Sequence, residues 1–383
     1  MYIILLCYNF RVNLRRCCSD DAGRLMIAVA TLQCVSCVTH DVCSNSYSLS
    51  TDDLGLTYEV LVWPPSIQDH TEASFSVVAT STWTSTNVRV RFPTASDDCL
   101  IVFGAAQLDC GQTLNFTLLS MEIASFTSTT TDLSGTLVEA SVPVAVYANN
   151  SRVTIGPSNV TDSTSEQLFP VSAWGRQFIV APVPDNSHSG YSIRVTCGTA
   201  VNVNVDISGI AYDLTSQRPL TIGFPDNRPA YVNVIGDSGS DVLQLVQFVH
   251  GATVVADSGA PAALVVPAVE RFNHAYNLTA RYGYIAYVSI VIHQSDISGL
   301  RLNGQPLTVH DSAWLYVDSN NNWVTAAVHL PSSKSSTLEH TGQRQFGAYS
   351  YGYIRGHCAF AHPAGASLPP QVIYSSNHCY LQY

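Results

Sequence analysis

The sequence predicts an all-β protein built from tandem antiparallel β-sandwich-like units, and three observations lead to this prediction. Only 12% of the 383 residues are charged, and β-branched and aromatic side chains, which suit pleated sheets, are plentiful instead. Apolar and polar residues alternate with a period of two in 87–92 and 201–207, as they do in strands with one buried face. Clusters of Gly, Asn, Asp and Ser separate such runs, and Asn303-Gly304 has the composition of a two-residue hairpin turn.

The first 40 residues contain a candidate leader. Behind Arg24 and Met26, residues 27–38 form a run of mainly small and apolar residues, as in the apolar region of a secretory signal peptide. We interpret 26–40 as a candidate signal peptide and 1–25 as an extension of the gene model or a tail. A single disordered N-terminal tail is the alternative interpretation.

A weak internal repeat organises the rest of the chain, which is too long for one ordinary core. Leu168-Phe169-Pro170-Val171 and Val265-Val266-Pro267-Ala268 each lead into a strand, and Trp63-Pro64-Pro65 begins a fainter, earlier copy. Each copy ends on an apolar run, at 142–147, 242–249 and 346–351. We predict about three repeats of roughly 100 residues within 60–368, with sub-units at 60–165, 166–262 and 263–368 and a tail at 369–383.

Cysteine usage beyond residue 40 favours an oxidising compartment. Six cysteines lie there, and an even number suits a disulfide framework in an exported protein. Closeness along the chain favours two pairs and leaves a third, although the sequence alone leaves other pairings open. The candidates are Cys99 with Cys110, Cys358 with Cys379, and Cys43 with Cys197.

Glycosylation sequons and net charge also favour export. Four Asn-x-Ser/Thr triplets make Asn115, Asn149, Asn159 and Asn277 glycosylation candidates. The net charge of −11 argues against nucleic acid and anionic membrane surfaces as partners, because both need clustered Lys and Arg. No apolar run of about 18 residues occurs in the sequence, so no membrane span is expected. We therefore expect a secreted, extracellular glycoprotein.

One segment is similar to a catalytic loop. Gly236-Asp237-Ser238-Gly239-Ser240 resembles the nucleophile loop of chymotrypsin-type serine proteases, whose histidine base lies upstream in an Ala-Ala-His-Cys context. His40, His70 and His188 lack that context, and Gly, Asp and Ser are also common in turns. We interpret the segment as a turn and predict no catalytic residue and no cofactor. A secreted hydrolase that uses Ser238 is the alternative.

A second cluster, near the C-terminus, offers residue types that zinc accepts. It consists of His357, Cys358, His362, His378 and Cys379. The spacing is poor and no Cys-x-x-Cys pair occurs in this region, so we favour a disulfide with exposed histidines. The acidic pairs at 52–53 and 97–98 are expected as solvated turns rather than catalytic carboxylates. The oxygen-rich run 318–322 lacks the spacing of a calcium loop and is expected as a turn or surface loop, with bound calcium as the alternative. No metal ligand is therefore predicted.

Tyr349, Tyr351 and Tyr353 alternate near the end of the chain. Alternate residues of a strand share a face, so these three rings would form a stripe on one side of a sheet. Such a stripe offers a large contact area with polar tips, which makes the three residues candidates for a binding surface. Half-buried packing within a sheet is the alternative.

Three blocks resemble one known family. Residues 166–178 are similar to a Leu-Pro-Pro-x-x-x-Trp-Gly-x-x-Phe segment, and 141–147 resembles a Lys-Pro-Val-x-Val-Tyr/Phe strand. Residues 346–353 and then 363–365 resemble a closing Phe-Gly-x-x-x-Tyr-Gly … Pro-Ala-Gly signature. The blocks follow the order of the IgG-Fc-binding protein N-terminal domain family, and the resemblance covers about 60–368. The chain departs from the family pattern at 354–362, onto which no function is carried.

The resemblance implies a secreted, non-enzymatic binding or structural module of mucus, extracellular matrix or innate defence. Its expected partner is an extracellular protein or glycan. Long members of the family carry von Willebrand-type D modules, which this sequence lacks, so the chain is expected to be an isolated recognition domain or a truncated product. Residues that contact Fc cannot be assigned from the resemblance. A cell-surface adhesion fragment is the alternative function.

Overall fold

The structure is a computed structural model of an almost entirely β protein, in which strands make up 56% and helix 5%. It describes residues 49–50, 53–81, 85–94, 99–158, 160–185, 190–198, 202–215, 218–236, 241–252, 259–310, 313–317, 322–331, 334–354 and 358–368, and the backbone alone of 6–7, 10–16, 27–34, 373–375 and 378–380. The predicted all-β class is confirmed. In this part of the chain, no helix is long and apolar enough to cross a membrane.

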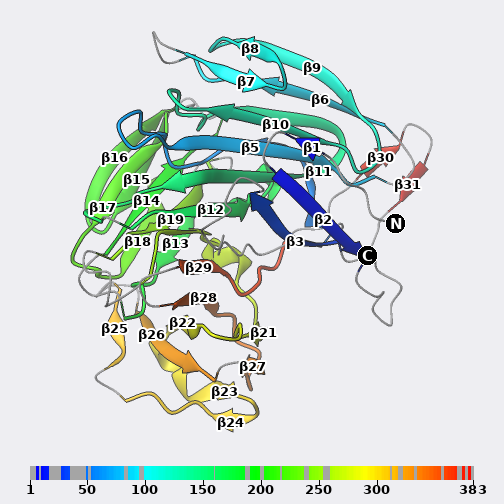
Figure 1. The fold of residues 1–383 in the computed structure, drawn as a ribbon. Helices are drawn as coiled ribbons and strands as arrows, with labels where there is room; N and C mark the ends of the chain where they lie inside the picture. Colours follow the sequence, from blue (N-terminus) through cyan, green and yellow to red (C-terminus); the bar gives the residue numbers. More distant parts are fainter. Residues whose placement is uncertain are drawn as a thin grey trace. The chain divides into compact units, whose positions relative to one another are not determined.

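Contacts divide the chain into two compact units (Figure 1). The first unit comprises 1–153, 163–173 and 368–383, and the second comprises 154–162 and 174–367. Two small antiparallel sheets belong to the first unit, one of β1 (Leu6–Cys7), β2 (Phe10–Arg16) and β3 (Ile27–Cys34), the other of β30 (Ile373–Ser375) and β31 (His378–Tyr380). Strand β3 lies within the segment expected as a signal peptide, and that assignment stays a prediction. The three-repeat boundaries also stay a prediction.

The main sheet of the first unit is organised around one long strand, β11 (Leu137–Val153). Residues 137–140 of β11 pair with β6, whereas 144–152 pair with β5, and the register shifts between these parts. Pro143 lies at the shift, where its missing N–H interrupts no regular ladder. The sheet order is β8-β7-β10-β5-β11-β6-β9, with β4 and β12 also paired to β11. The remaining bounds are β4 (Gly55–Glu59), β5 (Glu72–Ala79), β6 (Thr86–Arg91), β7 (Ile101–Phe103), β8 (Ala106–Leu108), β9 (Thr113–Leu118), β10 (Ile123–Ser128) and β12 (Asp162–Gln167).

Phenylalanine rings fill the interior of this unit. Phe126 stacks on Phe75 with ring centroids 4.7 Å apart and on Phe103 at 4.6 Å, and Phe92 meets it edge-on at 5.6 Å. Phe75, Phe92 and Phe126 are fully buried. Strand β6 is alternately buried and exposed, which confirms the period-two pattern predicted for 87–92.

The second unit contains four antiparallel sheets. The first two are ordered β13-β18-β15-β16 and β17-β14-β19-β20, and the other two β21-β27-β23-β24 and β25-β26-β22-β28-β29. Strand β15 shows the predicted alternation, and the predicted turn at Asn303-Gly304 joins β23 to β24 with positive φ angles of 54° and 75°. The first eight strands are β13 (Gln177–Val180), β14 (Tyr191–Thr196), β15 (Asn202–Ile207), β16 (Ile210–Thr215), β17 (Leu220–Phe224), β18 (Ala230–Val234), β19 (Gln244–Val249) and β20 (Ala262–Val265). The others are β21 (Ala275–Thr279), β22 (Ile285–His293), β23 (Leu300–Leu302), β24 (Gln305–Pro306), β25 (Leu315–Tyr316), β26 (Trp323–Leu330), β27 (Ser335–His340), β28 (Gly347–Ile354) and β29 (Cys358–Pro363).

Two local features recur at corresponding places along the chain. Short 3-10 turns, η2 (Val171–Ala173) and η3 (Val269–Arg271), follow the two predicted repeat prolines. A tyrosine lies in β4 and another in β21, and both make the same pair of hydrogen bonds. The Gly55 N–H donates to the Tyr58 hydroxyl (2.8 Å), which donates to the Val144 carbonyl (2.6 Å). In the same way the Asn273 N–H donates to the Tyr276 hydroxyl, which donates to the Phe346 carbonyl. These paired features fit an internal repeat without fixing the number of copies.

Candidate functional site

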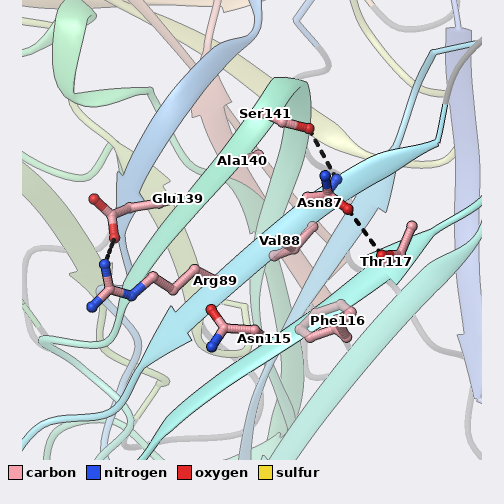
Figure 2. A pocket seen from close by; sticks show the side chains of 9 residues that line it. All are labelled: Asn87, Val88, Arg89, Asn115, Phe116, Thr117, Glu139, Ala140 and Ser141. Atoms are coloured by element: carbon pink, nitrogen blue, oxygen red, sulfur yellow. Dashed lines mark hydrogen bonds and ion pairs between the residues drawn. The ribbon is translucent and has the colours of Figure 1, made fainter.

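The candidate site lies on the outer face of strands β6, β9 and the first part of β11, in the first unit (Figure 2). Antiparallel pairing sets Arg89 of β6 between Asn115 of β9 and Glu139 of β11. Because alternate residues of a strand share a face, Asn87 joins this row while Val88 and Val90 point to the core and are buried. Strand pairing therefore gathers polar side chains from three strands on one exposed surface, which we call the polar face.

The polar face is held together by a few hydrogen bonds and one ion pair. The Asn87 N–H donates to the Ser141 hydroxyl (2.9 Å), and the Thr117 hydroxyl donates to the Asn87 side-chain oxygen (2.9 Å). Arg89 and Glu139 form a long ion pair of 3.7 Å, with side chains 54% and 45% exposed. An exposed pair of this kind contributes at most about 1 kcal/mol to stability. Both charges therefore remain open to further partners.

A shallow hollow of about 500 Å³ lies on the polar face. Nine described residues line it: Asn87, Val88, Arg89, Asn115, Phe116, Thr117, Glu139, Ala140 and Ser141. These side chains offer amide, hydroxyl, guanidinium and carboxylate groups, which donate and accept hydrogen bonds, and neither histidine nor cysteine is among the nine. The hollow is therefore rich in groups that donate and accept hydrogen bonds.

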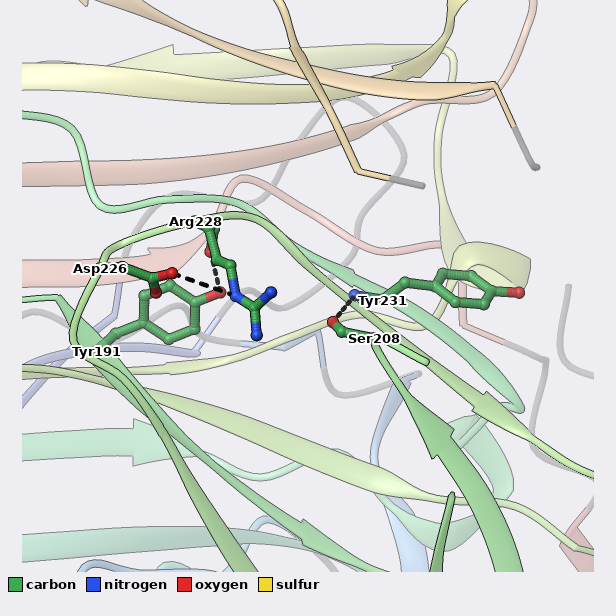
Figure 3. Close-up of polar contacts among 5 residues, drawn as sticks. All are labelled: Tyr191, Ser208, Asp226, Arg228 and Tyr231. Carbon is green, nitrogen blue, oxygen red and sulfur yellow. Dashed lines mark hydrogen bonds and ion pairs between the residues drawn. The ribbon is translucent and has the colours of Figure 1, made fainter. Parts of the chain in front are cut away.

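A second polar cluster supports the turn between β17 and β18 (Figure 3). The Tyr191 hydroxyl donates to the Arg228 carbonyl (2.7 Å), and the Arg228 guanidinium lies 3.4 Å from Asp226. The Tyr231 N–H donates to the Ser208 hydroxyl (3.3 Å). Burial raises the pKa of Tyr191 well above its usual value, so its phenol stays a neutral donor. These contacts anchor a turn to the core.

A serine–histidine pair, which no pattern in the sequence predicts, occurs between β14 and the end of β19. The Ser192 hydroxyl on β14 lies 2.8 Å from His250 Nε2, just after β19, and both side chains are buried. Such a pair can activate a nucleophile when substrate reaches it. Gly156, with φ +75°, lies so close to the imidazole that a Cβ there would be 2.4 Å from the ring. The pair is therefore closed off by packing and joins the strands as a structural hydrogen bond.

The structure confirms a disulfide for only some of the cysteines predicted to form one. Cys99 and Cys110 form a disulfide with Cα atoms 5.6 Å apart, and Cys358 is also disulfide-bonded. Cys197 is buried among apolar side chains of the second unit, and its predicted pairing with Cys43 stays a prediction. Cys43 and the side chain of Cys379 lie outside the described residues.

The predicted sequons differ in exposure. Asn115 on β9 and Asn277 on β21 are exposed. Asn149 is 8% exposed, and its side-chain oxygen accepts a hydrogen bond from Ser165 (2.7 Å). The amide of Asn149 is therefore committed inside the sheet, which argues against it as a glycosylation site. Asn159 lies outside the described residues.

The tyrosine stripe is buried, so the prediction of a binding surface is wrong and the packing alternative holds. Tyr349, Tyr351 and Tyr353 are 0%, 4% and 6% exposed. Their hydroxyls donate to the Ile179 carbonyl (2.8 Å), the Gln247 side chain (2.6 Å) and the Asp185 carboxylate (2.6 Å). The stripe thus fastens β28 to the preceding sheets of the second unit.

Several other sequence candidates can be placed only in part. Ser238, His357, the acidic pair 97–98, Asp52 and residues 318–321 lie outside the described residues, as do the side chains of 378–379. His362 is partly buried and stacks on Phe360, with ring centroids 5.5 Å apart. Since Cys358 is oxidised, it cannot serve as a zinc thiolate. Within the described part of the chain, no group of three His, Cys, Asp or Glu side chains could hold a metal ion.

The motif at 174–178 owes its residue types to packing in the second unit. Trp174 and Phe178 are buried. A Cβ on Gly175 would lie 2.3 Å from the Ala268 side chain. The Glu270 carboxylate accepts a hydrogen bond from the Arg176 N–H (3.0 Å). Glycine at position 175 therefore allows the backbone after Trp174 to approach η3 closely.

The fold and the polar face together define a class of proteins: all-β modules that offer an open sheet face for contact. The family described as IgGFc binding protein matches residues 44–352, and the chain belongs to this family. The human IgGFc-binding protein is 27% identical to the chain over 252 residues, which are 66% of this chain and 4% of that protein. The chain thus spans a small fraction of that relative. The resemblance inferred from the sequence blocks is confirmed.

Proposed function

We propose that the chain is a secreted, non-enzymatic binding module of mucus, extracellular matrix or innate defence, and that the polar face holds an extracellular protein partner. The observation that carries the proposal is the exposed, hydrogen-bonding hollow around Arg89 and Glu139. Membership of a family of binding proteins supports the role. The name of the human relative makes the Fc fragment of IgG the first partner to test.

The charged side chains of the polar face are better placed to bind a partner than to stabilise the fold. Arg89 and Glu139 are about half exposed and 3.7 Å apart, so water satisfies much of each charge. A partner that presents a carboxylate to Arg89 and a cation to Glu139 would desolvate both groups in complementary surroundings. Arginine is also enriched among the residues that dominate interface energies. These two side chains are therefore expected to determine affinity and orientation.

The test is equilibrium binding of the full chain, secreted from animal cells and immobilised, to IgG Fc and to other extracellular proteins, with Fab as a control. Arg89→Glu or Glu139→Arg is expected to weaken binding about tenfold or more, which corresponds to about 1.4 kcal/mol. The double swap keeps an ion pair on the face but reverses its direction. The double variant is therefore expected to recover the stability of the wild type but to bind the partner as weakly as the single variants.

Asp213→Arg is the matched control, because Asp213 is an exposed acid on β16 of the second unit. It changes the net charge by as much as Glu139→Arg and is expected to leave affinity unchanged. Equal binding by all the variants would contradict the polar face as the site. If none of the tested extracellular proteins shows saturable binding, the proposed protein partner is contradicted, and a glycan becomes the ligand to test.

A further inference from the structure

Two of the sequons lie on strands that end a sheet. Strand β9, which carries Asn115, is the last in the order β10-β5-β11-β6-β9, and β21, which carries Asn277, is the first in β21-β27-β23-β24. Both asparagines are exposed, as are Thr117 and Thr279, the third residues of the two sequons. The neighbouring Tyr276 and Leu278 point into the core instead. The acceptor amides therefore face outward from two sheet edges.

A terminal strand presents unpaired backbone groups that can pair with another chain, and natural proteins protect such edges. A bulky, soluble glycan on the edge strand would do so by excluding a second strand. The exposed face of β21 carries Ala275, Asn277 and Thr279 and no charged side chain of its own. The exposed side of β9 likewise carries Thr113, Asn115 and Thr117. Glycans would supply the protection that charges do not supply on these strands.

The third described sequon shows the opposite environment. Asn149 lies in the middle of β11, opposite Ser74 of β5, and is 8% exposed. Its amide nitrogen lies 3.4 Å from the Tyr147 carbonyl and its oxygen accepts the Ser165 hydroxyl. A sugar on this amide would have no room between the strands. A chain glycosylated there could not reach the native fold.

We propose that the native protein carries N-linked oligosaccharides on Asn115 and Asn277, and none on Asn149, and that these glycans cover two sheet edges. The inference rests on the proposed secretion of the chain. The amide nitrogen of each asparagine attacks the anomeric carbon of a lipid-diphosphate-linked oligosaccharide in the secretory pathway. A C–N bond forms, the C–O bond to the diphosphate breaks, the lipid diphosphate leaves with the electron pair, and the amide loses one proton.

The glycan on Asn115 also bears on the candidate site, because Asn115 lines the hollow of the polar face. Strand pairing sets Asn115 directly opposite Arg89. The attached sugars therefore stand beside the charge that is expected to determine affinity, and they restrict the direction from which a partner can approach. Glycosylation at this residue regulates access to the polar face.

The test is site occupancy in the full chain, expressed in animal cells and recovered from the medium. Enzymatic release of N-glycans in heavy-oxygen water converts each occupied asparagine to a labelled aspartate, which peptide mass spectrometry locates. Label is expected at Asn115 and Asn277 and not at Asn149. Thr117→Ala and Thr279→Ala should each remove one glycan, whereas Thr117→Ser and Thr279→Ser, which keep the sequons, should remove none.

Self-association provides a second readout. Light scattering is expected to detect more oligomer in the double Thr→Ala variant than in the double Thr→Ser variant. Unlabelled Asn115 or Asn277, labelled Asn149, or equal scattering by the two double variants would overturn the inference. A parallel full chain with a foreign secretion signal ahead of Met1 separates the two proposals. Occupancy in that protein without export of the original chain would contradict secretion and leave the glycan assignment standing.

Discussion

Burial keeps the phenols of Tyr349 and Tyr351 neutral, because desolvation raises the pKa of each well above its ordinary value. Both hydroxyls donate across to strands far away in sequence, to the Ile179 carbonyl and to Gln247. Gln247 in turn donates to the Ala181 carbonyl (2.9 Å). A chain of buried hydrogen bonds thus joins β28, β19 and the segment after β13. Removing one member leaves a buried partner unsatisfied.

Tyr351→Phe is expected to lower the free energy of unfolding by about 1–3 kcal/mol, since the Gln247 oxygen loses its donor in a dry environment. Urea unfolding of the variant and the wild type measures this difference. Tyr282→Phe is the matched control, because Tyr282 is 86% exposed and should change stability by less than about 0.5 kcal/mol. Equal effects of the two substitutions would show that the buried hydroxyl adds nothing.

His362 makes stability depend on pH. Desolvation lowers the pKa of its imidazole below the ordinary 6.5, and the hydrogen bond to the Pro363 carbonyl opposes this shift. Below about pH 6.5 the unfolded chain therefore binds more protons at this residue than the folded chain does. This part of the stability is complete above that pH and is lost as the pH falls below it. Urea midpoints from pH 7.5 to pH 5 should therefore decrease.

His362→Gln is expected to flatten this decrease. The comparison between the variant and the wild type matters, because burial raises the pKa of Glu72 and makes that carboxyl act in the opposite sense at lower pH. Both proteins contain Glu72, so its contribution cancels in the difference. Identical pH dependence of the two proteins would contradict the assignment to His362.

Single residues also show where sequence prediction stops. The sequon triplets of Asn115 and Asn149 look alike, yet one amide is exposed and the other is bonded inside the sheet. The alternation of Tyr349, Tyr351 and Tyr353 correctly predicts a shared face. It does not say whether that face meets water or another sheet, because the answer depends on strands about 100 to 170 residues earlier.

Among the elements, the backbone step at Gly175 depends on a small residue. A Cβ at this position would lie 2.3 Å from the Ala268 side chain and 2.7 Å from the Glu270 carboxylate. Gly175→Ala is therefore expected to lower the free energy of unfolding by about 1–3 kcal/mol, the usual cost of overpacking. Chemical denaturation of the full chain measures the change.

Gly223→Ala is the control for this substitution. Gly223 lies within β17, and the nearest atom to a Cβ there is the Ser192 hydroxyl at an ordinary 3.7 Å. Alanine should be tolerated at this position, because it fits and reduces the freedom of the unfolded chain. If Gly175→Ala and Gly223→Ala had the same free energy of unfolding, the close contact between Gly175 and η3 would contribute nothing to stability.

His340 fastens the loop after β27. Its Nε2–H donates to the Asp296 carbonyl (2.8 Å), while Nδ1 accepts from the N–H groups of Gly342 (3.0 Å) and Arg344 (3.3 Å). His340→Ala removes all three hydrogen bonds and should cost about 2–4 kcal/mol of stability. Amide exchange at 342 and 344 should become faster. Unchanged protection of these amides would contradict the role of the imidazole.

At the scale of elements, period-two alternation predicts β6 and β15, and the Asn-Gly pair predicts the β23–β24 turn. The same patterns could not predict that β11 serves two sets of partners, because the register shift at 139–144 arises from pairing with β4, β5 and β6. The polar face was missed for the same reason. Its signal was the run of alternate polar residues on β6 and β9, which has meaning only once their neighbours in the sheet are known.

At the scale of the whole molecule, the sequence is sufficient to predict the all-β class and the family. It is not sufficient to predict the candidate site, because the strands that form the site are brought together only in the folded sheet. The residues at 174–178 that resemble the family motif serve packing in the second unit. A binding role is therefore expected to come from exposed residues outside the motifs. Arg89, Asn115 and Glu139 are such residues.

Hydrogen–deuterium exchange of the full chain, alone and with saturating partner, would locate the binding surface, with IgG Fc as the first probe. If the polar face binds the partner, slower exchange is expected only at 86–91, 113–118 and 137–141, which lie on the three strands of the polar face, and Arg89→Glu should lose that protection. Protection confined to the second unit, or the same protection in Arg89→Glu as in the wild type, would contradict binding at the polar face.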